Sequence, residues 1–163
     1  VHISEENLET IKEYTRKIAE EMGLSISEFN LLWEKAENQR EFDLKYEEYQ
    51  KSLPLESRII LESRLGFLCQ PKAFKVFLDV RDEVASERIR KDQRTTDQFS
   101  SKDEALSATK KRNADDRARF LSLYEVDLWD DRNYDLKIDT SDLSAEQVCF
   151  RIIARFSEIV AVK

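Results

Sequence analysis

The chain has 163 residues, with 27 basic and 34 acidic side chains and a formal net charge of −7. This length suits one domain, and we expect residues 1–163 to form a single one. No apolar run of 18 residues and no signal-peptide pattern occurs, so we expect a cytoplasmic protein that does not span a membrane. The single histidine, His2, argues against a histidine-based metal site or a serine–histidine triad.

The charge is unevenly distributed along the chain. Residues 1–50 carry 6 basic and 13 acidic side chains, whereas residues 81–119 carry 11 and 9. Nucleic acids and anionic membranes favour basic patches, so we expect neither as a partner, while the middle of the chain could hold a small anion. The two cysteines, Cys69 and Cys149, have no paired spacing and predict neither a disulfide framework nor a metal site. No feature of the sequence fixes the oligomeric state.

The N-terminal part is predicted to be helical. Apolar residues at helical spacing predict a helix over residues 7–22, with Gly23 as its C-cap. The sequence Ser25–Glu28 (SISE) is a capping box that predicts the start of a second helix. A third, polar helix is expected over residues 40–52, before Pro54.

Strands and helices then alternate. Strands are expected over residues 58–63, 74–80 and 134–139, and helices over residues 81–91, 102–124 and from 144 onward. This order predicts an α/β fold with a parallel sheet. Ligands bind at the carboxyl ends of such strands, which draws attention to Ser63-Arg64, Arg81-Asp82 and Thr140-Ser141.

Residues 110–120 read KKRNADDRARF and set arginines around two aspartates. Arg112, Asp116 and Arg119 stand at i, i+4 and i+7, so a helix would place them on one face. An apolar stripe of Leu106, Leu121 and Tyr124 is expected beside this face. Two interpretations stay open: a solvated face of weak ion pairs, or guanidinium groups that bind phosphate oxygens.

Several stretches together resemble the cytidylate kinases, especially the short form. They are YTRKIAEEMGLSISEFN, IILESRLG, KVFLDVRDEVASERIRK, KKRNADDRARFLSLYEVDL and YDLKIDTSDLSAEQV. The resemblance implies phosphoryl transfer from ATP, with Mg²⁺, to CMP or dCMP. It also implies a helical nucleoside-binding insertion over about residues 24–53 and a mobile lid over about residues 88–120.

The resemblance implies roles for individual residues, each transferred onto a matching position. The substrate-binding residues are Arg16, Arg64, Arg112, Asp116 and Arg119. The catalytic residues are Arg88, Arg112 and Arg119, and the cofactor-binding residues are Lys91, Thr140 and Ser141. No protein ligand to a metal is implied.

One departure from the family is large. Such kinases begin with a strand and a G-x-x-x-x-G-K-[ST] loop, the P-loop, that holds the donor phosphates. The only glycines here are Gly23 and Gly66, so these 163 residues do not contain that loop. The expected fold is therefore a parallel three-layer core of the P-loop kinase type in which the P-loop strand is missing or replaced. That strand normally lies between those matching RIILES and FKVFLDV, so two strand edges would lack partners.

Two explanations of the missing loop stay open. Either an N-terminal segment precedes Val1, with Val1–Ser4 (VHIS) as the remnant of the strand after the loop, or the protein is a relative that functions without it. The first makes the complete protein a kinase, although this chain alone is expected to be inactive. The second makes it an inactive nucleotide-binding or interaction protein on the same fold. A third hypothesis is a charged helical scaffold unrelated to these kinases.

Overall fold

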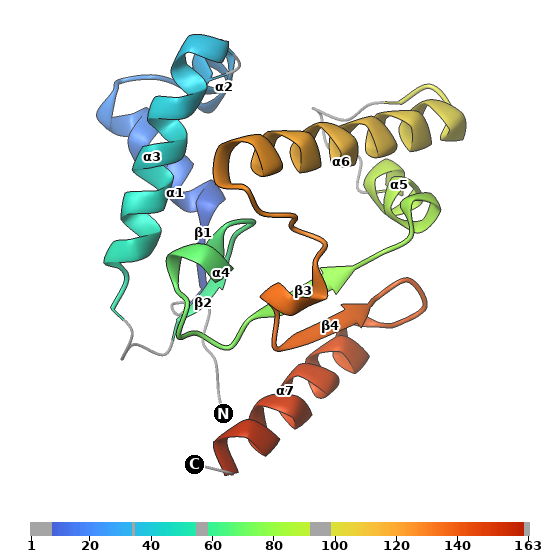
Figure 1. Ribbon diagram of the computed structural model, residues 1–163. Coiled ribbons are helices and arrows are strands. Elements are labelled where there is room, and N and C mark those ends of the chain that lie inside the picture. The colour runs from blue at the N-terminus through green and yellow to red at the C-terminus, as the bar shows by residue number, and fades with distance from the viewer. Residues whose placement is uncertain (1–7, 34, 55–58, 92–98, 162–163) are drawn as a thin grey trace. The chain divides into compact units, whose positions relative to one another are not determined.

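The computed structural model describes residues 8–33, 35–54, 59–91 and 99–161. The chain divides into two compact units, residues 1–73 and 74–163. Each unit contains a two-stranded parallel sheet with helices (Figure 1). The predicted α/β class and parallel pairing are thus confirmed, with most of the described residues in helices. That the two units make up one domain stays a prediction.

The first unit contains two strands and four helices. Strand β1, Leu8–Thr10, pairs in parallel with β2, Ile60–Glu62, with Leu8 opposite Ile60 and Thr10 opposite Glu62. The helices are α1, Ile11–Glu21; α2, Ile26–Trp33; α3, Ala36–Ser52; and α4, Gly66–Cys69.

Strand β1 corrects the helix predicted over residues 7–22. The helical spacing of apolar residues includes residues 8–10, but the backbone of these residues pairs with β2 instead. A partner strand 52 positions away is a tertiary effect that local periodicity does not contain. The suggestion that Val1–Ser4 is a strand remnant lies outside the described residues.

The core of this unit lies among its three longer helices. Phe29 is fully buried, and its ring meets that of Phe42 at 4.9 Å between centroids. Ile18, Ala19 and Tyr46 are also buried in this cluster. The predicted capping box opens α2: the backbone amide of Ser25 donates to Glu28 Oε2 at 2.8 Å, and the amide of Glu28 donates to Ser25 Oγ at 3.2 Å.

The second unit is built around the other strand pair. Strand β3, Val76–Asp79, pairs in parallel with β4, Leu136–Asp139, in the register Val76 to Leu136. Its helices are α5, Asp82–Lys91; α6, Lys102–Tyr124; the short η2, Asp131–Asn133; and α7, Ala145–Ala161. Its buried apolar residues are Ala105, Phe120, Leu128, Ile138 and Val148.

Among the described strands, β2 pairs only with β1 and β3 only with β4. Ile60 of β2 is 44% exposed and Leu78 of β3 is 51% exposed. Neither β2 nor β3 is therefore covered on both faces.

Helix α6 also differs in detail from its prediction. Its buried residues are Ala105, Thr109 and Phe120, whereas Leu121 is 52% exposed. The expected apolar stripe is thus misplaced, because a mostly polar helix contains too few apolar residues to define its inner face.

None of the described helices is long and apolar enough to cross a membrane. Both cysteines are free, with Cys69 buried and Cys149 exposed.

The end of α1 generates a stability prediction. Gly23 has a φ of +69° and open space where a Cβ would stand, so its conformation, not packing, requires glycine. We expect Gly23→Ala to lower the free energy of unfolding by about 1 kcal/mol, and Gly23→Asn by less. Urea unfolding followed by circular dichroism measures both, and equal stability of Gly23→Ala and the parent chain would contradict the assignment.

Candidate functional site

Two of the predicted arginines lie in the first unit. Arg64 comes two residues after Glu62, the last residue of β2, and Arg16 lies in the second turn of α1. Since Thr10 pairs with Glu62 and α1 follows Thr10 directly, both arginines follow the carboxyl ends of this strand pair. Both residues are exposed. In parallel sheets, ligands bind at this edge, and Arg64 lies two residues beyond it whereas Arg16 lies six residues beyond it.

The predicted stripe on α6 is present on a single helix. Arg112 is exposed and has no ion-pair partner among the described residues. Arg119 Nη2 lies 3.9 Å from Asp116 Oδ1, and its guanidinium lies 4.6 Å from the centre of the Phe120 ring. The stripe therefore has an exposed cation at one end and an arginine held by its neighbours at the other.

Arg88 lies against the residues that follow β4. Its Nη2 donates to the backbone oxygen of Thr140 at 2.7 Å, and Nη1 lies 3.3 Å from Thr140 Oγ1. Thr140 Oγ1 donates to the backbone oxygen of Asp79 at 2.9 Å, and Ser141 Oγ accepts from the amide of Arg81 at 2.9 Å. The structure thus brings together the predicted site residues Arg88, Thr140 and Ser141. Their hydrogen bonds, however, are made within the protein and hold α5 to the ends of β3 and β4.

Lys91 belongs to a different cluster. Its Nζ lies 3.7 Å from Glu87 Oε1, which also accepts from Arg90 Nη2 at 3.0 Å. Lys102 of α6 lies 3.6 Å from the other oxygen of Glu87. The hydrogen bond from Arg90 lowers the pKa of the Glu87 carboxyl. Among the described residues, no contact joins Lys91 to Thr140. The resemblance to cytidylate kinases nevertheless gives both residues a cofactor-binding role.

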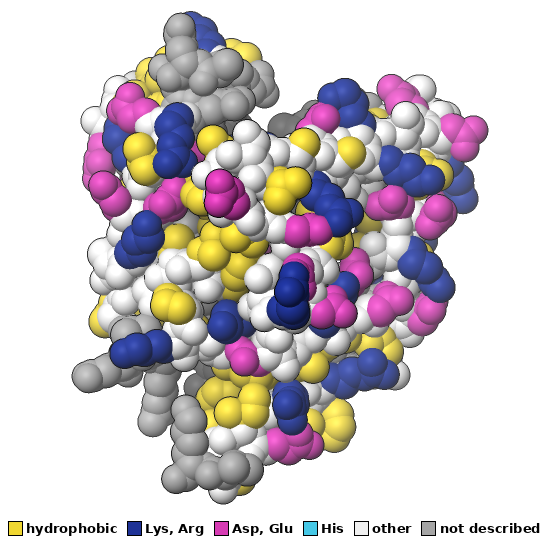
Figure 2. All heavy atoms as spheres, in the orientation of Figure 1, with side chains coloured by type: hydrophobic (Ala, Val, Ile, Leu, Met, Phe, Trp, Pro, Cys, Tyr) yellow, Lys and Arg dark blue, Asp and Glu magenta, His cyan; other side chains and the backbone are white. Residues whose placement is uncertain are grey.

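The surface of α5 and α6 mixes both signs of charge. Figure 2 shows Lys and Arg side chains interspersed with Asp and Glu over these helices. Asp82 accepts a hydrogen bond from Asn113 Nδ2 at 2.9 Å, and Glu83 lies 3.9 Å from Lys110 Nζ, so the two helices are joined by polar pairs. Such a surface suits a small anion better than a long polyanion, which needs a continuous basic patch.

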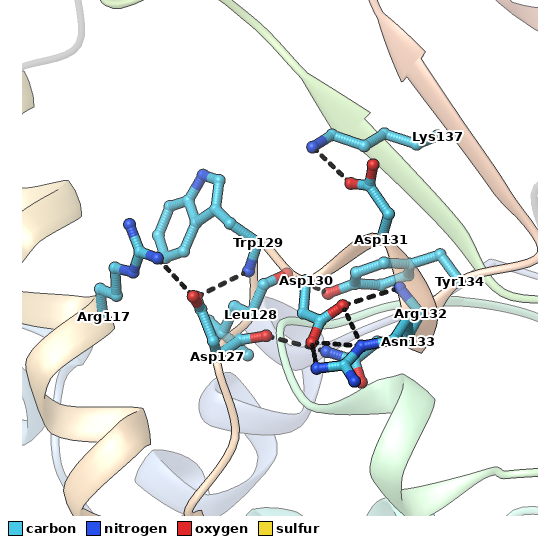
Figure 3. A network of polar contacts seen from close by, with 10 residues as sticks. All are labelled: Arg117, Asp127, Leu128, Trp129, Asp130, Asp131, Arg132, Asn133, Tyr134 and Lys137. Carbon is cyan, nitrogen blue, oxygen red and sulfur yellow. Dashed lines mark hydrogen bonds and ion pairs between the residues drawn. The ribbon is translucent and has the colours of Figure 1, made fainter.

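Arg117, in the same KKRNADDRARF stretch, has a structural partner. It bonds to the carboxylate of Asp127 in the loop that joins α6 to β4 (Figure 3). The guanidinium also lies 5.8 Å from the centre of the Trp129 ring. Arg117 therefore fixes the loop to helix α6.

Sequence reasoning missed the polar network of this loop. Arg132 Nη2 donates to Asp130 Oδ2 at 2.5 Å, and Tyr134 Oη donates to the backbone oxygen of Leu128 at 2.8 Å (Figure 3). The hydrogen bonds from Arg132 lower the pKa of Asp130 to about 2. Burial raises the pKa of Tyr134 to about 12. The Asp130-x-Arg132 spacing at a turn was the available signal, since an aspartate there caps the backbone amide two residues later.

A family model and several relatives point to the same family. A model of the cytidylate kinase-like family matches residues 1–142. A cytidylate kinase from Pyrococcus abyssi is 34% identical over 134 residues, which are 82% of this chain and 70% of that protein. One from Methanocaldococcus jannaschii is 32% identical over 148 residues, which are 85% of this chain and 76% of that protein. The chain belongs to the cytidylate kinase-like family.

A further relative carries a different name. An S-adenosylmethionine-dependent nucleotide dehydratase from Lacinutrix mariniflava is 37% identical over 155 residues. These are 94% of this chain but only 31% of that protein, so the chain spans about a third of this relative's length. No solved structure matches the chain significantly.

The family implies ATP and Mg²⁺, and the described residues can be tested for both. Asp79, at the end of β3, accepts from the amide of Val80 at 2.9 Å and lies 3.7 Å from Lys137 Nζ. Across the described part of the chain, no three side chains of His, Cys, Asp or Glu are grouped to hold a metal ion. The hydroxyls of Thr140 and Ser141 are engaged as above. These residues do not by themselves fit a magnesium ion or the donor phosphates.

The loop network yields a prediction about Tyr134. Its raised pKa means that the folded state favours the neutral phenol. The resulting stability is complete below pH 10, the ordinary pKa, and is lost as the pH rises through about 12. Tyr134→Phe should remove this pH dependence. It should also lower the free energy of unfolding at neutral pH by about 1 kcal/mol, since the hydrogen bond to Leu128 is lost.

Ultraviolet absorbance of tyrosinate between pH 9 and 12.5, with urea unfolding at pH 7, measures both effects. Tyr124→Phe is the matched control, because Tyr124 is also half-buried in this unit but lies on α6, outside the loop in which Tyr134 bonds to Leu128. Ionisation of every phenol near pH 10 in the folded parent chain would contradict the assignment.

Proposed function

We propose that this chain provides acceptor-binding and lid parts of a nucleoside monophosphate kinase that acts on CMP or dCMP. The observation that carries the proposal is the position of Arg64, exposed directly after a parallel strand in a member of this family. Arg16 follows the neighbouring strand and supplies a second cation. Guanidinium groups bind phosphate through paired N–H donors and stay charged at all physiological pH values.

The proposed lid consists of Arg112, Asp116 and Arg119, with Arg88 at its start. Phosphoryl transfer depends mainly on positioning and on neutralising the charge of the transferring group, and arginines can provide both. Asp116 would orient Arg119, to which it is ion-paired. The proposed roles of Lys91, Thr140 and Ser141 in holding the donor nucleotide rest on the family alone. The three-layer core is likewise proposed from the family.

A second candidate is a nucleotide-binding protein that does not transfer phosphate. It is supported by the internal hydrogen bonds of the Thr140 and Ser141 hydroxyls. The relative named as a nucleotide dehydratase, of which this chain spans about a third, is compatible with such a binding part in a larger protein that acts on nucleotides.

Nucleotide binding is the first test. Isothermal titration calorimetry should detect CMP binding to this chain, and Arg64→Ala should weaken it about 10- to 100-fold, because charge-assisted hydrogen bonds are lost. Arg155→Ala is the control, since Arg155 is exposed on α7 and paired only with Glu158 among the described residues. Unchanged affinity in Arg64→Ala, or no heat of binding in the parent chain, would contradict the proposal.

Turnover separates the two candidates. With CMP, ATP and Mg²⁺, the 163-residue chain should form no CDP, because it has no loop to hold the donor phosphates. The protein translated from the complete natural reading frame should form CDP if it is a kinase, and Arg112→Ala should reduce the rate at least tenfold. CMP binding without CDP formation by that complete protein would instead support the second candidate.

A further inference from the structure

A buried polar network lies beneath Arg64 in the first unit. Gln50, near the end of α3, is 1% exposed. Its side-chain oxygen accepts a hydrogen bond from the hydroxyl of Ser63, the residue before Arg64, and its Nε2 donates to the backbone oxygen of Tyr46 at 3.0 Å. Both ends of the Gln50 amide are therefore used, one on helix α3 and one on the loop after β2.

The loop is closed by two further contacts. Ser63 Oγ also accepts from the backbone amide of Leu65 at 3.1 Å, so the hydroxyl joins the residues on both sides of Arg64. Gly66 lies immediately behind, where a Cβ would stand 3.3 Å from Leu61 and 3.4 Å from the Cβ of Ser63. Hydrogen bonding and close packing thus leave the backbone of residues 63–66 little freedom.

Gln70 secures the same helix end from the other side. Its Nε2 donates to the backbone oxygens of Gln50 at 2.6 Å and of Leu53 at 3.1 Å. These oxygens stand at the end of α3, where a helix leaves carbonyl groups without internal partners. Ser63, Gln50 and Gln70, which we call the Gln50 network, therefore join the end of α3 to the segment that carries Arg64.

We propose that Gln50 is a positioning residue, which holds Arg64 in place for the phosphate of the nucleotide and couples it to helix α3. Its role in nucleotide binding rests on the proposed function of Arg64. A buried amide that is hydrogen-bonded through both its oxygen and its nitrogen favours one arrangement, because a displacement leaves a desolvated polar group unpaired. Movement of α3 at its C-terminal end is therefore transmitted to Arg64, and binding of a phosphate at Arg64 stabilises one position of α3.

The test compares four variants with the parent chain. Gln50→Leu removes both side-chain hydrogen bonds at similar volume. Ser63→Ala removes only the hydroxyl, and Ser63→Thr restores one. Ser52→Ala is the matched control, since that hydroxyl also lies at the end of α3 but donates to the backbone oxygen of Tyr49 at 2.7 Å, outside the network.

The first measurement is hydrogen–deuterium exchange of residues 63–69, which needs no ligand. Exchange should be about tenfold faster in Gln50→Leu and Ser63→Ala, and unchanged in Ser63→Thr and Ser52→Ala. If Gln50→Leu does not fold, the Ser63→Ala and Ser63→Thr pair decides the result. Equal exchange in all the folded variants would overturn the proposal.

The second measurement is the CMP dissociation constant at 50 and 300 mM NaCl. Gln50→Leu and Ser63→Ala should weaken binding about tenfold and flatten its dependence on salt, because a displaced guanidinium no longer contributes its screened attraction. Faster exchange with unchanged CMP affinity would show a merely structural network and overturn the proposal. If the parent chain binds no CMP, the proposed function fails, and the exchange result alone decides whether Gln50 holds the Arg64 segment.

Discussion

Both units depend on the parallel pairing of short strands. Strands of three and four residues give few hydrogen bonds, yet each pair sets the starting point of the segments that follow it. In the first unit these are the segments of Arg16 and Arg64, and in the second they begin at Val80 and Thr140. Every predicted site residue outside α5 and α6 therefore owes its position to one of these two pairings. Such short strand pairs need further stabilisation from side chains. Gln50 in the first unit and Arg88 in the second provide it through hydrogen bonds to the segments that follow β2 and β4.

The arginines of this protein fall into two groups by their surroundings. Arg88 and Arg117 donate to loops of their own unit, as does Arg132 beside Asp130, so their charge stabilises structure. Arg16 and Arg112 are exposed, without an ion pair among the described residues. Arginines of the second group are accessible to a ligand that arrives from solution, as is the exposed Arg64. For Arg88 to act in catalysis, a donor nucleotide would thus have to compete with the backbone oxygen of Thr140 for the hydrogen bond of the Arg88 guanidinium.

Local features of the fold were predictable from the sequence. The capping box at Ser25 and the C-cap at Gly23 each depend on a few neighbouring residues, and both are present. The long helix of Arg112 was predicted for the same reason. The resemblance to cytidylate kinases, read from five ordered stretches, identified the family that the comparisons confirm.

Features set by distant residues were not predictable. Strand β1 exists because residues 8–10 meet residues 60–62, and the apolar periodicity of this region predicts helix. Gln50 gave no signal, since a glutamine in a polar helix looks solvent-exposed until Ser63 and Gln70 are placed beside it. The inner face of α6 was misassigned because burial of Thr109 and Phe120 depends on packing partners elsewhere in the unit.

The central claim is that the first unit binds the phosphate of a pyrimidine nucleotide through Arg64. Arginine side-chain N–H signals, recorded by ¹H–¹⁵N NMR and assigned with Arg64→Lys, test it most directly during a titration with CMP. The account predicts that the Arg64 signal shifts and saturates with CMP, while cytidine, which has no phosphate, leaves it unmoved. An Arg64 signal that does not respond to saturating CMP would contradict the account.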